Sequence, residues 1–233
     1  MVIEPMKCGT EEFEVHLPEE LIAAELEPNR VELPQRTPAE HIRWALDHPV
    51  DSAPLKELVK AGDKVCIVIS DVTRRWQSPE TYIPVLIAEL ESAGIRDEDM
   101  LIISATGTHR RQTPEEHMGL VTKEVYERIE LVDHVCTDEE NLSYVGTTSR
   151  GTPVWLDKRA LACDKIILTG GVVYHFMAGF GGGRKSILPG IAGRETIMKN
   201  HNLALNPGLG NGSNPQVRSA NMNATNPVHA DMM

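Results

Sequence analysis

The sequence predicts an α/β fold: a Rossmann-like, doubly wound and mostly parallel sheet, with a small β-hairpin and a peripheral N-terminal segment. Three apolar runs of strand length, at 65–70, 100–104 and 165–169, alternate with amphipathic helical segments. The first run, VCIVIS, is rich in β-branched residues without a polar alternation, which is typical of a strand buried on both faces of a parallel sheet. Buried strands that alternate with helices indicate a doubly wound sheet.

The first sixty residues are expected to lie at the periphery. Residues 11–17, EEFEVHL, alternate polar and apolar side chains as an edge strand does, and a proline-spaced segment follows. Thr37 is expected to cap a helix that stops before Pro49, and a second short helix is expected at 55–61. We therefore expect residues 1–60 to pack as a peripheral segment on an α/β domain formed by residues 61–233.

The helices of the core have recognisable starts. Ser78 and Pro79 are expected to begin a helix whose apolar residues recur at 3.6-residue spacing until Gly94 closes it. Thr113 is expected to start the next helix by the same capping chemistry. The remaining expected elements are a helix at 122–129, a strand at 131–135, a hairpin over 142–156 turned at Arg150 and Gly151, and a helix at 194–200.

Composition restricts the class of partner. The chain has 233 residues, 41% of them hydrophobic, which is sufficient for a buried core. Its formal net charge of −11, from 34 acidic and 23 basic residues, argues against a nucleic acid or an anionic membrane as the main partner and favours a small molecule. Its start does not resemble a signal peptide and no apolar run reaches membrane-spanning length, so we expect a cytoplasmic protein. Its four cysteines lack metal-type spacing and are expected to be reduced thiols.

A glycine-rich stretch between residues 165 and 201 is the most distinctive feature of the sequence. Its glycines precede Arg184 and Lys185 and allow the backbone to approach a ligand closely. The nearest known pattern is the phosphate-binding G-x-x-x-x-G-K-[ST] loop. Arg184 occupies the position of the glycine before the lysine, and Pro189 stands where the following helix should run. We therefore expect a loop that binds an anionic ligand of another kind.

Polar residues follow three of the expected strands. Asp71 and Arg74 follow the first, His109 follows the second, and His175 follows the third. Loops at the carboxyl ends of parallel strands converge on the ligand in open α/β sheets, so these residues are candidates for one site. Each has a plainer interpretation as well. Asp71 and Arg74 could form a local ion pair of little consequence, and each histidine could be an ordinary loop residue.

His201 follows the last expected helix and has two interpretations. It could interact with the carboxyl end of the helix dipole. Together with His109 and His175 it could instead complete a three-imidazole site for zinc, nickel or copper. The spacing of the histidines does not decide between these interpretations.

Several longer motifs occur together and in order. They are SDVTR at 70–74, ATGTHR at 105–110, GTTSRGTPV at 146–154, HFMAGFGGGRKSILPGIA at 175–192, and NH at 200–201. This set resembles the nickel-dependent lactate racemase family over most of residues 60–233. The resemblance implies a racemase or epimerase of lactate or a related 2-hydroxy acid.

The resemblance also implies a cofactor and its site. The cofactor is a nickel-pincer nucleotide, pyridinium-3-thioamide-5-thiocarboxylic acid mononucleotide with nickel, and its partners are a small 2-hydroxy acid and the enzymes that make the cofactor. The family lysine that binds the cofactor covalently matches Lys185, and the nickel-ligating histidine matches His201. The family acid/base histidines match His109 and His175, and the substrate-assisting residues match Asp71 and Arg74. The loop glycines Gly182 and Gly183 are expected to close around the cofactor, and Arg184 is expected to balance its phosphate charge.

The chemistry of such a reaction agrees with this assignment. The hydrogen on C2 of a hydroxy acid is a poor acid, so its removal as hydride requires a cofactor that accepts it. A base must take the hydroxyl proton, and histidine has a suitable pKa near neutrality. The two enantiomers present the hydroxyl at different places, which gives a reason for two histidines.

Three departures from the family pattern leave the identity of the substrate open. Arg75 and Tyr174 stand where many relatives have proline, and Gly181 replaces a common serine. Relatives also continue into a second domain that is absent from this chain, so we expect the isolated chain to be inactive or nearly so. The alternative function is a non-catalytic nucleotide- or anion-binding module that uses the same loop.

Overall fold

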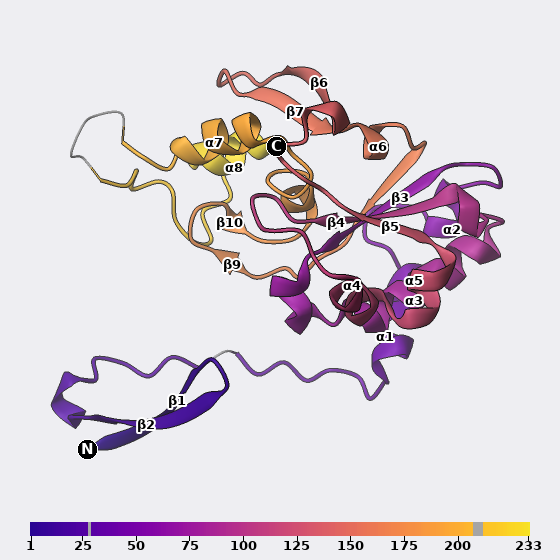
Figure 1. Ribbon diagram of the computed structural model, residues 1–233. Coiled ribbons are helices and arrows are strands. Elements are labelled where there is room, and N and C mark those ends of the chain that lie inside the picture. The colour runs from indigo at the N-terminus through magenta and orange to yellow at the C-terminus, as the bar shows by residue number, and fades with distance from the viewer. Residues whose placement is uncertain (28, 207–211) are drawn as a thin grey trace. The chain divides into compact units, whose positions relative to one another are not determined.

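The computed structural model describes residues 1–27, 29–206 and 212–233 (Figure 1). The chain divides into two compact units, residues 1–35 and residues 36–233. The division therefore falls earlier than the expected boundary at residue 60, and the segment 36–60 belongs to the larger unit.

The smaller unit is an antiparallel hairpin. Strand β1 (Val2–Cys8) pairs with β2 (Glu11–Leu17), and a 3-10 turn, η1 (Glu19–Leu21), follows. The strand expected at 11–17 is therefore confirmed. The first strand was not among the expected elements, and it contains Pro5. Proline lacks a backbone donor but is tolerated in an edge strand, and β1 has only one neighbour.

A parallel sheet of four strands forms the centre of the larger unit, which confirms the predicted α/β class. The strands lie in the order β5-β4-β3-β8, and every neighbouring pair is parallel. The sheet consists of β3 (Val65–Ser70), β4 (Met100–Ala105), β5 (Glu130–Asp133) and β8 (Lys165–Leu168). The expected strand at 131–135 thus begins one residue earlier and ends at Asp133.

Both faces of the sheet are covered, as the apolar run in β3 predicted. Val65, Ile67 and Ile69 pack in one apolar cluster with residues of α3, whereas Cys66 and Val68 pack in a second cluster. Since side chains alternate along a strand, one run of apolar residues supplies both cores. Helices α1, α3, α4 and α5 lie on one side of the sheet, and α6, α7, α8 and the β6–β7 hairpin lie on the other (Figure 1).

The helices on the first side are α1 (Pro38–Asp47), α3 (Pro79–Ser92), α4 (Pro114–Val121) and α5 (Lys123–Arg128), and α2 (Leu55–Leu58) packs through Leu55 against the same apolar cluster. The helices on the other are α6 (Lys158–Leu161), α7 (Arg194–Asn202) and α8 (Pro227–Met232). The short pieces are η2 (Val72–Gln77), η3 (Asp97–Asp99), η4 (Glu139–Asn141), η5 (Gly183–Ser186), β6 (Leu142–Thr147), β7 (Pro153–Asp157), β9 (Tyr174–His175) and β10 (Gly179–Phe180). No helix within the described ranges is both long and apolar enough to cross a membrane.

Two helices begin at their predicted capping residues, whereas one other predicted cap and one predicted helix end differ from the structure. The capping boxes at Thr37 and Thr113 are present, each with side-chain and backbone hydrogen bonds to the glutamate three residues on. Ser78 was expected to cap α3 with its side chain and does not; it adopts φ +52° and makes no side-chain capping bond. The helix expected at 55–61 ends at Leu58, because the next residue, Val59, turns to an extended conformation and enters the core.

Candidate active site

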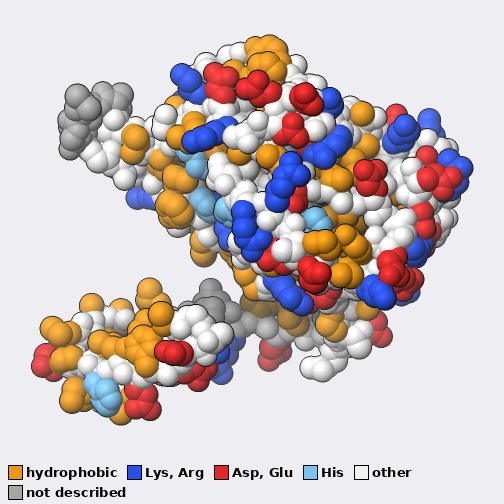
Figure 2. All heavy atoms as spheres, viewed as in Figure 1, with side chains coloured by type: hydrophobic (Ala, Val, Ile, Leu, Met, Phe, Trp, Pro, Cys, Tyr) orange, Lys and Arg blue, Asp and Glu red, His pale blue; other side chains and the backbone are white. Residues whose placement is uncertain are grey.

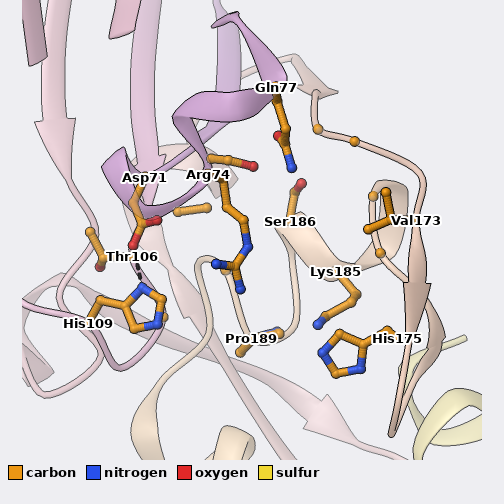
Figure 3. Close-up of a pocket in the computed structure, with 18 of the residues that line it drawn as sticks. Asp71, Arg74, Gln77, Thr106, His109, Val173, His175, Lys185, Ser186 and Pro189 are labelled. Carbon is orange, nitrogen blue, oxygen red and sulfur yellow. Dashed lines mark hydrogen bonds and ion pairs between the residues drawn. The ribbon is translucent and has the colours of Figure 1, made fainter. Parts of the chain in front are cut away.

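A cavity of about 550 Å³ lies at the carboxyl end of the parallel sheet. Its walls are the loops after β3, β4 and β8, the glycine-rich segment and one face of α7 (Figure 3). Seven of the nine candidate residues line it: Asp71, Arg74, His109, His175, Gly182, Lys185 and His201. The convergence that strand order predicts is therefore present. Gly183 and Arg184 do not belong to this lining.

Asp71 and His109 form a hydrogen-bonded pair across two strand ends. Nδ1 of His109 lies against Oδ2 of Asp71, and the aspartate side chain is only 4% exposed. The other carboxylate oxygen accepts from the backbone and hydroxyl of Thr73, at 3.1 Å and 2.6 Å. A neutral His109 with its proton on Nδ1 keeps an unprotonated Nε2, which can accept a proton from a ligand.

Arg74 lies in η2 and extends into the cavity between His109 and Lys185 (Figure 3). Its Nη1 atom is 3.2 Å from Oγ1 of Thr73. The local ion pair with Asp71 that the sequence left open is not formed, since the carboxylate of Asp71 pairs with His109. Arg74 is therefore available to bind an anion from the cavity.

Lys185 is the second cation of the cavity. Burial, together with the charges of Arg74 and Arg184, lowers the pKa of its amine to about 8. Within the described part of the chain, no carboxylate pairs with it. An amine with a pKa this low is a better nucleophile near neutral pH than an ordinary lysine, because a larger fraction is unprotonated.

His175 lies next to Lys185 (Figure 3). Its Nδ1 accepts hydrogen bonds from the backbone N–H groups of Met177 and Ala178, at 3.2 Å and 3.1 Å. Burial, and then the charge of Lys185, lower the pKa of its ring to about 4. The ring is therefore neutral at pH 7, and with Nδ1 acting as an acceptor its proton is on Nε2. His175 is thus arranged as a hydrogen-bond donor, whereas His109 is arranged as an acceptor.

His201 lies within the last turn of α7, inside the helix rather than beyond its end as expected. Burial and the neighbouring Lys185 lower the pKa of its ring. Its Nδ1 atom is buried and makes no hydrogen bond of ordinary geometry with the described residues. A neutral, buried imidazole suits a metal ligand, because metals bind the unprotonated ring.

The histidines do not form a metal site by themselves. The described residues include no group of three or more His, Cys, Asp or Glu side chains that could hold a metal ion. The alternative of a three-imidazole site at His109, His175 and His201 is therefore wrong. These histidines come from a loop, a strand and a helix, and their spacing along the sequence gave no information on the distances between them. A metal bound at His201 would need further donors from a bound molecule.

The glycine-rich loop differs from a nucleotide P-loop in structure as well as in sequence. Lys185 lies in a 3-10 turn, and no α-helix follows it until α7. Gly182 has φ +71°, and a Cβ atom there would lie 3.2 Å from the carbonyl oxygen of Gly171. Its lack of a side chain lets two backbone segments lie together at the wall of the cavity.

Arg184, which the sequence assigned to a phosphate, points elsewhere. Its guanidinium donates to the carbonyl of Ala178, and its buried Nε atom has no partner among the described residues. It influences the cavity through its charge, which contributes to the low pKa of both Lys185 and His175. Gly183, the neighbouring candidate, has open space around it.

The charge of the cavity is opposite to that of the whole chain. Asp71 is the one acidic residue in its described lining, and it is already paired with His109. Arg74 and Lys185 remain, in a protein whose formal net charge is −11. Figure 2 shows histidine and basic side chains gathered near α7 and β10 on the visible face. Such a cavity is complementary to an anion such as a carboxylate or phosphate.

Thr106 and Gln77 are among the residues of the wall that were not expected to face a ligand. Thr106 lines the cavity, and its hydroxyl donates to the backbone carbonyl of His134. Its position in the motif ATGTHR could have marked it as a residue that faces the cavity. Gln77 also lines the cavity, and its buried Oε1 atom has no partner among the described residues. Nothing in the sequence around Gln77 marks it as a ligand-facing residue.

A comparison with protein families gives one match that covers most of the chain. The family model described as the lactate racemase N-terminal domain matches residues 8–212. The chain belongs to the lactate racemase family. Its sequence is 36% identical to a lactate racemase of Lactiplantibacillus plantarum over 194 residues, and 32% identical to one of Thermoanaerobacterium thermosaccharolyticum over 192 residues.

Solved structures agree with this family membership. The lactate racemase apoprotein from Thermoanaerobacterium thermosaccharolyticum superimposes with a TM-score of 0.81 and 30% identity, over 99% of this chain and 52% of that one. A protein from Thermotoga maritima shares the fold, with a TM-score of 0.61 and 21% identity over 83% of this chain and 46% of that one. The alignments cover 83% and 82% of this chain but only 44% and 43% of the two lactate racemases, so the chain spans about half the length of these relatives.

Proposed function

We propose that this chain is the cofactor-binding part of a racemase or epimerase of 2-hydroxy acids, with lactate or a close relative as substrate. The observation that carries the proposal is Lys185, an amine with a pKa of about 8 in a cavity that also contains His201 and the His109–Asp71 pair. Family membership supports the same activity. The coverage of the relatives supports a second part of the enzyme outside residues 1–233.

The residues present fit the nickel-pincer nucleotide that the family resemblance implies. The amine of Lys185 would hold it covalently, and the buried imidazole of His201 would supply one nickel ligand. When bound, the cofactor supplies a hydride acceptor that no amino-acid side chain provides. The absence of a three-residue metal cluster among the described residues is consistent with a cofactor that brings its own donors.

The side chains of this chain would then have separate roles in binding the substrate and in moving its hydroxyl proton. The guanidinium of Arg74 binds and orients the substrate carboxylate. Nε2 of His109 takes the hydroxyl proton as the 2-keto acid forms, and Asp71 stabilises the resulting imidazolium through Nδ1. His175 takes the hydroxyl proton of the opposite enantiomer at Nε2, which requires its own ring proton to move from Nε2, where the bonds from Met177 and Ala178 place it, to Nδ1. In the tautomers described above, His109 is ready to accept a proton and His175 is ready to donate a hydrogen bond.

We also propose how this chain fits into the whole protein. Residues 61–233, within the larger unit of residues 36–233, form the cofactor-binding domain. A second domain supplies additional substrate contacts, and residues 1–233 alone turn over slowly because an open cavity admits water. Enzymes that make the cofactor are its partners, and the protein acts in the cytoplasm.

Chiral chromatography tests the activity directly. Cofactor-loaded protein incubated with one enantiomer of lactate is expected to form the other until the two are equal. The non-catalytic alternative predicts reversible binding of phosphate or nucleotide, with no nickel and no formation of the second enantiomer. A panel of 2-hydroxy acids in the same assay identifies the preferred substrate.

A further inference from the structure

Gln112 connects three strand ends behind the candidate active site. Its Oε1 accepts from the backbone N–H of Val72 at 2.6 Å. Its Nε2 donates to Oγ of Ser104 at 2.6 Å and to Oδ1 of Asp133 at 2.8 Å. Its own backbone N–H donates to Oδ2 of Asp133, also at 2.8 Å. Val72 follows β3, Ser104 is the penultimate residue of β4, and Asp133 ends β5.

The orientation of this amide is set by its partners. A backbone N–H can only donate, so the atom that faces Val72 must be the oxygen. A carboxylate can only accept when it is ionised, so the atom that faces Asp133 must be the nitrogen. Both requirements are met by one rotamer of one amide. Neither a carboxylate nor an apolar side chain of similar size could satisfy all of these groups.

Asp133 is itself firmly held. Its Oδ1 atom lies 2.9 Å from Nε2 of His117, and its side chain is 7% exposed. Although burial acts to raise the pKa of Asp133, the hydrogen bonds from His117 and Gln112 lower it overall. Asp133 is therefore an ionised and fixed anchor, and a hydrogen bond from Gln112 to it is charge-assisted.

This network holds both segments that carry the Asp71–His109 pair. Val72, which donates to Gln112, directly follows Asp71, and Gln112 lies three residues after His109. The hydrogen bond between Nδ1 of His109 and Oδ2 of Asp71 joins the same two segments. His109 is 47% exposed, so little packing restrains its ring. Its orientation depends on where Asp71 is held.

We propose that Gln112 is a positioning residue, which holds Asp71 against Nδ1 of His109 so that His109 presents an unprotonated Nε2 to the cavity. Gln112 does not line the cavity and so does not touch the substrate. The proposal rests on the proposed role of His109 as a base. It is testable without that role, because the position of the ring proton can be measured in the ligand-free chain.

The measurement is the tautomer of His109, read from the ring nitrogen shifts of ¹⁵N-histidine-labelled protein near neutral pH. The wild-type chain is expected to carry the proton on Nδ1. Gln112→Met removes the amide oxygen and nitrogen while keeping a similar side-chain volume. Gln112→Asn keeps the amide but shortens the side chain, so that its oxygen no longer reaches the N–H of Val72. Each is expected to lower the ratio of Nδ1–H to Nε2–H tautomer roughly tenfold, the factor that loss of a hydrogen bond to a charged group produces.

Ser104→Ala is the matched control. It removes one partner of the same amide nitrogen, and Val72 and Asp133 remain bonded to Gln112. Its tautomer ratio is expected to stay at the wild-type value, while backbone amide spectra verify that each variant is folded. If Gln112→Met does not fold, Gln112→Asn decides. A wild-type tautomer ratio in a folded Gln112 variant overturns the proposal, whatever the cofactor-loaded enzyme does with lactate.

Discussion

His175 lies beside Lys185 in the wall of the cavity, and burial of its ring together with the lysine charge lowers its pKa to about 4. The same surroundings lower the pKa of Lys185 to about 8. Burial and neighbouring positive charges both favour the neutral forms of these two side chains. The cavity is therefore arranged to receive negative charge, and its lysine loses a proton more readily than an ordinary lysine.

The reactivity of Lys185 should follow its low pKa. The amine is mostly protonated below about pH 8, and its nucleophilic fraction grows as the pH rises through that value. An ordinary lysine needs a pH of about 10.4 for the same change. Peptide mass mapping after brief treatment with an amine-reactive reagent should place the midpoint for Lys185 near pH 8. Arg74→Gln should move that midpoint upward, because it removes a neighbouring positive charge; a midpoint shared with the bulk of the lysines would contradict this view of the cavity.

His201→Ala should weaken the retention of nickel without loss of the organic cofactor. The metal would lose its imidazole ligand, whereas the covalent bond at Lys185 would survive. Nickel analysis and intact mass of the same sample separate the two effects. His117→Ala is a suitable control, because His117 is a buried histidine that is bonded to Asp133 and does not line the cavity. Unchanged nickel content in His201→Ala would move the ligand role to another residue.

The two histidines should be separable in single turnovers. In a complete, cofactor-loaded enzyme, His109→Ala should still oxidise one enantiomer to the bound 2-keto acid, and His175→Ala only the other. The impaired direction should slow by about 10² to 10⁴, the usual contribution of a positioned acid or base. Rapid-mixing spectroscopy with each pure enantiomer measures these rates. Wild-type rates for both enantiomers in both variants would leave the histidines without an acid/base role.

The motif GTTSRGTPV should contribute to stability through Asp231. This buried carboxylate accepts from the hydroxyls of Thr148 and Thr152, at 2.6 Å and 2.8 Å, and from the amide of Asn200 at 3.0 Å. Asp231→Ala removes the acceptor of three hydrogen bonds in this largely buried network, so we expect a loss of about 2–4 kcal/mol in the free energy of unfolding, measured in urea. Thr148→Val should cost less, since two of the three bonds remain. A loss below about 0.5 kcal/mol for Asp231→Ala would show that the network contributes little.

Local sequence predicted the sheet and the cavity position well, for physical reasons. The apolar run at 65–70 requires burial on both faces, and a parallel sheet with covered faces provides it. Since parallel strands end at one edge, residues that follow different strands, such as Asp71 and His109, could be expected to meet. Thr113 could be recognised as a cap because its partner lies three residues away.

Properties that depend on distant parts of the chain could not be predicted. Serine commonly caps helices, but the backbone conformation of Ser78 is set by the preceding turn, η2. The direction of the Arg184 side chain depends on the carbonyl of Ala178, which no sequence pattern places. The bonds of Gln112 join residues up to 40 positions apart, so its role emerges only from the structure.

The central claim is that Lys185 holds a nickel-bearing cofactor covalently, and intact-protein mass spectrometry tests it most directly. The wild-type chain, co-expressed with the enzymes that make the cofactor, should carry a mass addition that maps to Lys185, together with stoichiometric nickel. Lys185→Arg keeps the positive charge but replaces the nucleophilic amine, so it should fold and carry no addition. A full mass addition on Lys185→Arg, or a wild-type chain that binds nucleotide reversibly with neither addition nor nickel, would contradict the account.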